Sequence, residues 1–177
     1  MRWAGPAPTQ QKPHELAPQP SFAAQQVCIA PIGLHALMHT GSNPIRDSSI
    51  AVDTDFTAKL VDVWPDGTQM LVQDGIVRMR WRAGAFATAT SPPLVPGKPE
   101  RAELIIGLVS HVFDEGHRIG LTVSSSNNPR FSVNPNTGLP LNSSLPSLPT
   151  VNTVLSGGER PTRLLLPVVP LEALPVA

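Results

Sequence analysis

Two aspartates close together are the first residues of this sequence whose types and spacing could support chemistry. Asp53 and Asp55 are two residues apart, so in an extended segment they project to the same side. Paired carboxylates can hold Ca²⁺ or act as acid and base. Hydrolytic pairs, however, generally come from separate strands that face a cleft. We therefore expect a structural role, in which one carboxylate caps a loop or pairs with an arginine such as Arg78 or Arg80.

The arginines themselves form a second pattern. Arg78, Arg80 and Arg82 alternate with apolar residues over the stretch 76–82, which predicts a half-buried strand with one basic face. Trp81 is predicted to lie on the opposite, core face. The chain has a formal net charge of zero, whereas nucleic-acid binding needs a clustered excess of Lys and Arg. We expect no nucleic-acid partner, and a basic face that is either solvated or salt-bridged to another domain.

A third group combines histidines with carboxylates. His111, Asp114, Glu115 and His117 lie within seven residues, and such clusters can bind Zn²⁺. They flank a tight turn at Asp114-Glu115-Gly116, so we favour histidines that are hydrogen-bonded at strand ends. The sequence therefore predicts no metal site and no cofactor.

Nucleophilic catalysis has little support. A serine hydrolase of the α/β type holds its nucleophile in a Gly-x-Ser-x-Gly turn, and the sequence contains no such motif. Ser124, Ser125 and Ser126 end a predicted strand, and we interpret them as structural. Cys28 is the single cysteine, which rules out an internal disulfide. We predict no catalytic residue in this chain.

Asparagines dominate a long polar loop over residues 127–140. Loops carry function more often than strands do, so Asn127 and Arg130, together with Asp53, Asp55, Arg78 and Arg80, are the candidates to face a partner or a ligand such as a sugar. The alternative is that the asparagine side chains bond the loop's own backbone and hold it in place.

Composition and periodicity predict an all-β fold. The 21 prolines and 13 glycines argue against helices and for short strands with many turns. Period-two patterns and turn residues such as Trp64-Pro65-Asp66-Gly67 and Asp74-Gly75 mark the strands. We predict strands at Phe56–Val63, Thr68–Val72, Ile76–Arg82, Ala102–Val109, His117–Ser124, Val151–Leu155 and Thr162–Val169, in a β-sandwich or barrel.

The segment 1–49 lacks both strand and helix periodicity, and is rich in Pro, Gln and Ala. We predict an irregular, disordered extension over 1–49, a β-sandwich domain over 50–170 and a tail over 171–177. No segment of the sequence approaches the roughly 20 apolar residues of a membrane span. We expect no membrane partner and a cytoplasmic location.

Several motifs recur in a fixed order between about Ala51 and Val169, roughly two-thirds of the chain. These blocks are Val52–Gly67, Asp74–Arg82, Ser110–Phe113, Gly116–Ile119, Ser124–Phe131 and Asn134–Gly138. Their order and spacing resemble the C-terminal domain of CocE/NonD hydrolases, also described as the Xaa-Pro dipeptidyl-peptidase C-terminal domain.

The resemblance implies a jelly-roll β-sandwich of the galactose-binding-like type. In full-length members it packs on an α/β-hydrolase domain of the same chain, whose Ser-His-Asp triad hydrolyses esters or amides or releases Xaa-Pro dipeptides. Residues 1–47 do not resemble the family, and the strand that normally precedes the Asp-Thr-Asp-Phe block is not recognisable beyond a tail at Ser48–Val52. We hypothesise that the chain is a truncated or frame-disrupted gene product. Hydrolase-like sequence in another reading frame of the upstream DNA would support this hypothesis.

Three functional hypotheses follow. The first is a non-catalytic accessory domain of a CocE/NonD-type serine hydrolase, inactive alone. The second is a free-standing carbohydrate-binding module, which has few aromatic residues for sugar stacking. The third is a chain with no stable fold, because a sandwich without an early strand exposes an unpaired edge, unless residues before Ser49 supply that strand. The oligomeric state is left open.

Overall fold

The computed structural model describes residues 25–27, 31–41, 51–84, 89–140, 146–155 and 162–170. Within these ranges the chain forms β-strands and one short 3-10 turn, η1 (Met79–Trp81). The strands are β1 (Gln25–Val27), β2 (Pro31–Gly41), β3 (Asp55–Val63), β4 (Gln69–Arg78), β5 (Glu100–Leu108), β6 (His111–Phe113), β7 (Arg118–Ser124), β8 (Val151–Leu155), β9 (Arg163–Leu165) and β10 (Val168–Pro170).

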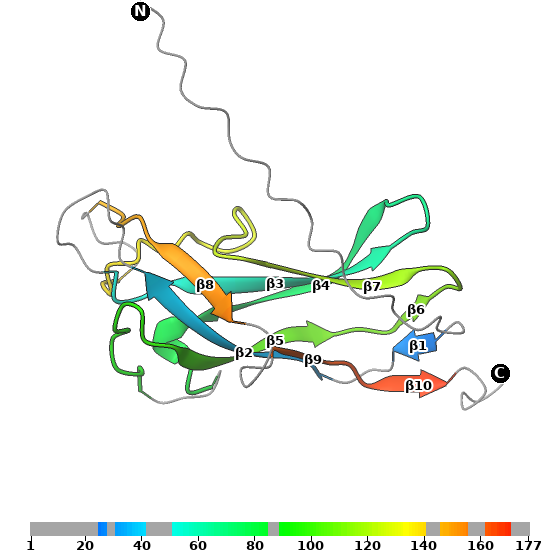
Figure 1. The fold of residues 1–177 in the computed structure, drawn as a ribbon, viewed down its shortest axis with the longest axis horizontal. Coiled ribbons are helices and arrows are strands. Elements are labelled where there is room, and N and C mark those ends of the chain that lie inside the picture. The colour runs from blue at the N-terminus through cyan, green and yellow to red at the C-terminus, as the bar shows by residue number, and fades with distance from the viewer. Residues whose placement is uncertain are drawn as a thin grey trace, which may run out of the picture.

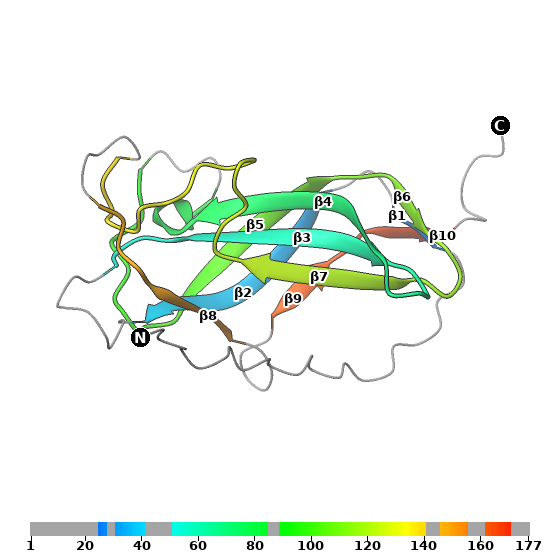
Figure 2. The same cartoon turned by 90° about the horizontal axis from the view of Figure 1, so that it is seen from above.

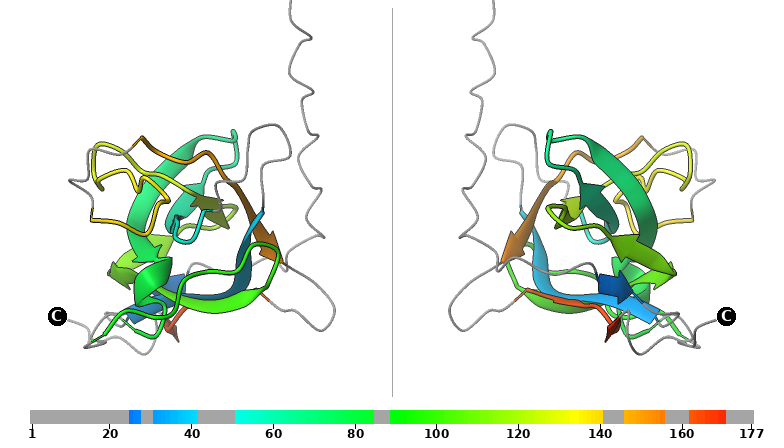
Figure 3. Two further views of the ribbon diagram at one scale, coloured as in Figure 1. Left: turned by 90° about the vertical axis from the view of Figure 1, so that its left-hand side faces the viewer. Right: turned by 90° about the vertical axis from the view of Figure 1, so that its right-hand side faces the viewer.

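The strands form three antiparallel sheets. The upper sheet has the order β4-β3-β7, and the lower sheet has the order β5-β2-β8 with β9 also paired to β2. A small end sheet has the order β10-β1-β6. Figure 1 shows the upper sheet above the lower one, with the end sheet at the right, and the view from above in Figure 2 shows how the layers overlap. The end-on views in Figure 3 show the same two layers. The predicted all-β sandwich is confirmed.

The core lies between the upper and lower sheets. The period of two along β5 buries Ala102, Leu104 and Ile106 and leaves the residues between them exposed. These inward side chains belong to one apolar cluster with Phe56 and Leu60 of β3. Burial of this cluster is the main apolar contribution that holds the two sheets together.

Strand β3 is covered on both of its faces. Phe56, Ala58 and Leu60 face the core, while Thr57 on the outer face is also fully buried. Thr57 Oγ1 lies 2.7 Å from Ser124 Oγ, at the start of the loop 125–140. Figure 1 shows this loop, drawn in yellow-green, above the upper sheet. The fold therefore places β3 between the core and a long loop.

The prediction of an irregular extension is wrong for β1 and β2. Each is the central strand of its sheet, and β2 supplies a strand before β3 that the sequence did not reveal. Pro31 is the first residue of β2, and the register shifts next to Gly33; proline and glycine are tolerated at these places in a strand. Residues before Ser49 thus supply a strand that precedes β3, so the premise of the third hypothesis, a sandwich without an early strand, is wrong. Cys28 and the predicted tail 171–177 lie outside the described residues, and the domain boundary at residue 49 stays a prediction.

The predicted turn at Asp74-Gly75 is wrong as well. One continuous strand, β4, runs through it, with Asp74 paired to Lys59 and Gly75 to Ala58 in register. A Cβ atom at Gly75 would clash with the backbone oxygen of Ile105. The glycine is needed here because β4 approaches β5 closely, and not because the chain reverses.

The end of the predicted strand 76–82 also differs. Strand β4 ends at Arg78, and η1 follows. The 3-10 turn breaks the period of two, so that Met79 is buried while Trp81 is 41% exposed. The prediction that Trp81 faces the core is therefore wrong.

The remaining strands follow the sequence closely. The strand Val151–Leu155 has the predicted bounds, and β3, β5 and β7 differ from prediction by one or two residues at an end. The turn at Trp64-Pro65-Asp66-Gly67 is confirmed, because Gly67 N donates to Trp64 O (2.9 Å) and Gly67 has a φ of 89°. The final predicted strand is split into β9 and β10 around Pro167, and the three-residue β6 was not predicted.

Neighbouring residues of β5 provide a test of the two-layer arrangement. Leu104 is 1% exposed and Ile105 is 52% exposed. Leu104→Ala should lower the free energy of unfolding by about 2–5 kcal/mol, because it leaves a cavity between the sheets. Ile105→Ala is the matched control and should change it by less than about 1 kcal/mol. Urea denaturation of the two variants measures both values, and equal losses would contradict the assignment of inward and outward faces.

Candidate functional site

Four aspartates are buried among the described residues, and many polar side chains are bonded to them. Asp53, Asp55, Asp62 and Asp74 are at most 5% exposed. Three of them lie on β3 or β4, and Asp53 lies two residues before β3. Burial of an ionised carboxylate is costly unless charged or hydrogen-bonding groups compensate for the lost water. Each of these aspartates should therefore have dedicated partners.

Asp55 forms a two-pronged ion pair with Arg78. The two residues stand opposite each other in the β3–β4 register. Arg78 donates from Nε to Oδ1 (2.8 Å) and from Nη2 to Oδ2 (2.7 Å), the bidentate geometry that a guanidinium group forms with a carboxylate. The hydrogen bonds to Asp55 raise the pKa of Arg78 above its ordinary value.

Asp53 forms the equivalent pair with Arg80. The η1 turn brings the backbone N–H of Arg80 to within 3.0 Å of Asp53 Oδ1, and Arg80 Nε donates to Oδ2 at 2.7 Å. Asn134 then joins the two pairs, because its Nδ2 donates to Asp53 Oδ2 (3.0 Å) and to Asp55 Oδ1 (2.7 Å). The expected pairing of these aspartates with arginines is confirmed. Their oxygens are occupied by internal donors, which leaves no support for the Ca²⁺ or acid–base alternatives.

Asp74 holds the beginning of the same loop. Arg130 Nε lies 2.7 Å from Asp74 Oδ1, and Asn127 Nδ2 donates to Oδ2 at 2.6 Å. Asp74 was predicted to lie in a turn, so its role as a buried anchor was missed. Its burial could not be deduced from an Asp-Gly pair that is typical of turns.

Together these contacts fasten the loop 125–140 to the upper sheet, and we call them the aspartate clamp. Its members are Asp53, Asp55, Asp74, Arg78, Arg80, Asn127, Arg130 and Asn134. The arginines also reach the loop's backbone, since Arg80 Nη2 donates to Leu139 O (3.0 Å). Asn134 Oδ1 accepts from Asn136 N (2.9 Å), and Asn136 Nδ2 donates to Leu148 O (2.7 Å). These bonds support the alternative in which asparagines hold the loop.

The clamp includes all six residues that the sequence predicted to face a partner or ligand. Asn134 and Asp74 complete it, and neither was predicted as a member. Asp53 and Asp55 are 1% and 2% exposed, whereas Arg130 keeps 59% of its side chain exposed. A partner- or ligand-facing role for Arg78, Arg80, Asn127 and Arg130 stays a prediction.

The side chains of Arg78, Arg80 and Arg82 thus find hydrogen-bond acceptors within the chain. Arg82 donates from Nη1 to Met79 O and to Pro92 O (both 2.9 Å), and its Nε lies 3.7 Å from Glu100. The prediction of a solvated basic face is therefore wrong, and a salt-bridged contact of this face with another domain stays a prediction. The side chains turn back onto buried carboxylates and carbonyls instead.

Asp62 forms a separate cluster at the other end of β3. His117 donates from Nδ1 to Asp62 Oδ1 (2.9 Å), and His111 donates from Nε2 to Oδ2 (3.2 Å). The His117 ring lies 5.5 Å from the ring of Trp64, and that of His111 packs edge-on against Phe113 at 4.7 Å. The predicted hydrogen-bonded histidines at strand ends are confirmed.

Two imidazoles share one carboxylate in this cluster. In a hydrolytic triad the carboxylate orients a single imidazole, whose other nitrogen takes a proton from a hydroxyl group. Here the contacts join β3, β6 and the residue before β7, which is a structural task. Asp114 and Glu115, the other members of the suggested Zn²⁺ cluster, are exposed. In the described part of the chain, no group of three or more His, Cys, Asp or Glu side chains could hold a metal ion.

Comparison with known proteins identifies the family. Residues 45–165 match the family model described as the X-Pro dipeptidyl-peptidase C-terminal non-catalytic domain. This chain belongs to that family. It is 46% identical over 126 residues to the cocaine esterase of Rhodococcus sp. (strain MB1 Bresler), a match that covers 69% of this chain and 21% of the esterase. The resemblance stated from the sequence motifs is confirmed.

Solved structures agree on the fold. An aminopeptidase from a marine sediment archaeon, Thaumarchaeota archaeon, matches with a TM-score of 0.63 at 27% identity, covering 85% of this chain and 25% of that one. A CocE/NonD family hydrolase from Staphylococcus aureus matches with a TM-score of 0.61 at 14% identity, covering 84% and 29%. This chain thus spans between a fifth and a third of the proteins that it resembles. Among the described residues, no helix has the length and apolarity needed to cross a membrane.

The clamp predicts a large stability loss when one carboxylate is removed. Asp55→Ala should lower the free energy of unfolding by about 3 kcal/mol, near the lower end for buried ion pairs because Arg78 is partly exposed. Lys98→Ala, which removes an exposed ion pair with Glu100, should cost less than about 1 kcal/mol. Urea denaturation would compare the two variants. An Asp55 variant as stable as the Lys98 variant would show that the clamp does not hold the loop.

The turn after β3 predicts a pH dependence. Asp66 Oδ1 accepts a hydrogen bond from Thr68 N (2.8 Å), which lowers the pKa of Asp66 below its usual value of 3.8. A lowered pKa in the folded state adds stability above pH 3.8, and this stability is lost as the pH falls through the folded-state pKa. Asp66→Asn should therefore flatten the decline in melting temperature below about pH 4. An identical decline in both proteins, measured by circular dichroism, would contradict this role.

Proposed function

We propose that this chain acts as the non-catalytic C-terminal module of a CocE/NonD-type serine hydrolase. The observation that carries the proposal is the match of residues 45–165 to a non-catalytic C-terminal domain, in a chain that spans only 21% of the related esterase. In this role the module packs on an α/β-hydrolase domain and shapes access to its substrate cleft. The triad that performs ester, amide or Xaa-Pro hydrolysis belongs to that partner domain.

The pairing of charged side chains with one another inside the domain supports an accessory role. The aspartate clamp uses its arginines and asparagines to fix a loop on the sheet, and the Asp62 cluster uses its histidines to join strands. Catalysis needs groups whose protonation or nucleophilicity is directed at a substrate. The buried polar residues described here are instead directed at each other, which suits a rigid supporting module.

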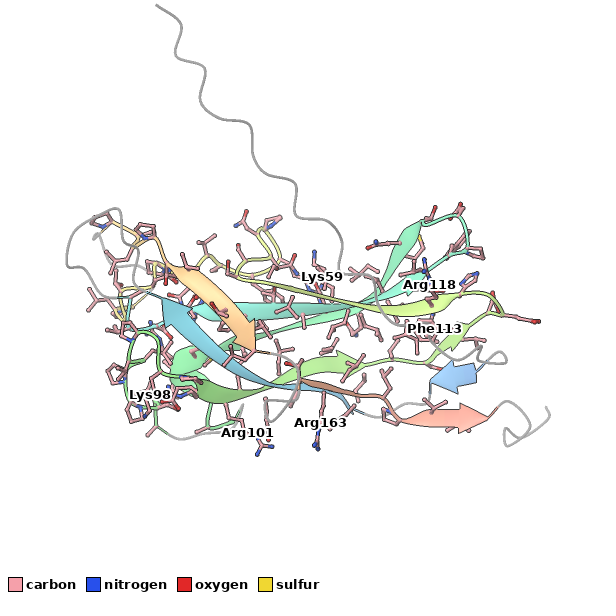
Figure 4. All side chains as sticks on the ribbon, viewed as in Figure 1. Lys59, Lys98, Arg101, Phe113, Arg118 and Arg163 are labelled. Atoms are coloured by element: carbon pink, nitrogen blue, oxygen red, sulfur yellow. The ribbon has the colours of Figure 1, made fainter. Side chains whose placement is uncertain are left out.

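The outer face of the lower sheet offers a surface for such a partner. Ile105 of β5 and Leu165 of β9 stand in one row on either side of Gly33, and both are about half exposed. Arg163 lies two residues from this row along β9 and Arg101 four residues from it along β5, and both side chains point away from the upper sheet (Figure 4). An apolar patch with a charged border is typical of surfaces that contact another domain. A cytoplasmic location stays a prediction from the sequence.

A chimaera tests the proposal. Residues 45–165 of this chain would replace the matched segment of the Rhodococcus cocaine esterase, and ester hydrolysis would be measured against the parent enzyme. We expect the chimaera to keep activity within about tenfold of the parent, because the clamp and the core are carried by the transferred residues. The chain alone should hydrolyse neither nitrophenyl esters nor Xaa-Pro substrates.

The control is the same chimaera with Asp55→Ala, which should lose activity on mild heating before the unmodified chimaera does. Two results would overturn the proposal. One is a soluble, folded chimaera without activity, and the other is turnover by the purified chain that a single serine substitution abolishes.

One observation favours the carbohydrate-binding alternative. Trp64 and Trp81 are 42% and 41% exposed, and exposed aromatic rings are what sugar stacking requires. They lie beyond opposite ends of the ten-residue strand β4, which spans roughly 30 Å, so they cannot form a single platform. A glycan-array signal that Trp81→Ala removes and Trp64→Ala retains would favour this alternative.

A further inference from the structure

The tip of the β3–β4 hairpin stands apart from the rest of the upper sheet. We define the tip as residues 61–71, which begin at the register shift between Leu60 and Val61. A β-bulge of this kind bends the bulged strand and increases its twist. Figure 1 shows the hairpin rising above the rest of the upper sheet, at the right of the picture. The tip therefore projects from the sandwich.

Both faces of this tip carry exposed apolar side chains. Residues that stand opposite each other in an antiparallel pair share a face, so Met70 lies on the face of Asp62 and Leu71 on the face of Val61. These two faces are opposite ones, yet Met70 and Leu71 are 51% and 56% exposed. An antiparallel sheet in water normally keeps its solvated face polar. Exposed apolar groups on both faces are typical of a surface that another protein covers.

The tip is also held in one shape by its own contacts. Trp64 N donates to Thr68 O (2.8 Å), and Gly67 N donates to Trp64 O (2.9 Å). The Trp64 ring lies 5.5 Å from the ring of His117, which donates to Asp62. A segment that is already ordered loses little conformational entropy on binding, and Trp and Met are enriched in protein interfaces. The tip thus has the rigidity and the composition of an interface anchor.

The exposure of both faces constrains the shape of the partner. A flat surface, or a second copy of the hairpin packed face to face, would cover one face of the tip and leave the other in water. Burial of Met70 and Leu71 together requires a cleft that encloses the tip from both sides. Apolar walls in this cleft would match the two side chains.

The charges around the tip constrain the partner further. A Cβ atom at Gly116 would lie 3.6 Å from Pro65 Cγ, so the β6–β7 turn lies beside the tip. Exposed carboxylates border the tip from both turns, those of Asp66, Asp114 and Glu115. Arg118 is the nearest cation in sequence, and none of these four side chains forms an ion pair within the described part of the chain. Anionic lipid headgroups would repel this excess of negative charge, whereas a protein cleft with Lys or Arg at its rim would attract it.

We propose that the hairpin tip inserts into an apolar cleft with a basic rim on the hydrolase domain. The inference rests on the proposed function, which supplies this partner. The chain spans 21–29% of the proteins that it resembles, so the greater part of each relative lies outside this module and has room for such a cleft. The contact is separate from the one proposed for the outer face of the lower sheet.

Thiol labelling tests whether the tip is enclosed on both faces. Met70→Cys and Leu71→Cys are each made in the full chain carrying Cys28→Ser, and in the chimaera with the Rhodococcus esterase. Both positions should react readily with a maleimide in the free chain. In the chimaera both should react at least about tenfold more slowly, because a desolvated interface excludes the reagent. Mass spectrometry of the labelled peptide measures each rate.

Two further positions serve as controls. Val95→Cys is the matched control, because Val95 is 56% exposed like Leu71. It lies at the opposite end of β3 from the tip, since the neighbouring Leu94 N donates to Val52 O. Its labelling rate should be the same in the free chain and in the chimaera. Ile105→Cys reports separately on the outer face of the lower sheet.

Three results would overturn the inference. The first is rapid labelling of position 70 or 71 in the chimaera, because the tip would then not be enclosed. The second is protection in the free chain that disappears on dilution, which would assign the tip to a second copy. The third is protection of the free chain by phosphatidylcholine–phosphatidylglycerol vesicles, which would assign the tip to a lipid surface.

Activity separates this inference from the proposed function. An active chimaera with a reactive position 70 or 71 would overturn the insertion alone. A folded, inactive chimaera in which both positions are protected would overturn the proposed function alone. If the chimaera is insoluble, residues 61–71 alone are transferred to the esterase, and the same two labelling rates decide the matter.

Discussion

The need to compensate buried negative charge determines how the upper sheet and its loops are arranged. A carboxylate removed from water needs cationic or N–H donors. Four such carboxylates are buried among the described residues, three on β3 or β4 and the fourth at Asp53. Asp53 and Asp55 bind Arg80 and Arg78, and Asn134 bridges them. The loop 125–140 cannot move away from the sheet without exposing or unpairing these charges. Its position is thus a consequence of where aspartates occur on two neighbouring strands.

This constraint also explains why the module suits support and not chemistry. Catalytic groups are aimed at a substrate and carry protonation states adjusted to that task. The arginines, asparagines and histidines of the aspartate clamp and the Asp62 cluster instead donate hydrogen bonds to carboxylates and carbonyl groups of the same domain. The same contacts let β3 be buried on both faces, with the core below and the loop above. A domain fixed in this way presents stable outer surfaces to a neighbour, which fits the non-catalytic character of its family.

Sequence analysis correctly predicted the features that leave a clear side-chain pattern. Period-two alternation located β3, β5 and β7, and the Asp-Thr-Asp-Phe block and its arginines indicated both the family and the ion pairs. The errors arose where local residue types point to another structure. Asp74-Gly75 is a typical turn pair, but β4 continues through it because Gly75 allows β5 to approach. Trp81 alternates correctly for a strand, but η1 turns it outward.

The strands β1 and β2 were missed for a different reason. They lie in a segment rich in Pro, Gln and Ala, and Pro31 and Gly33 interrupt the sequence pattern of β2. The family match covers the whole upper sheet, together with β5, β6, β8 and β9. The lower and end sheets take their central strands from the segment before residue 45, where the family model does not match.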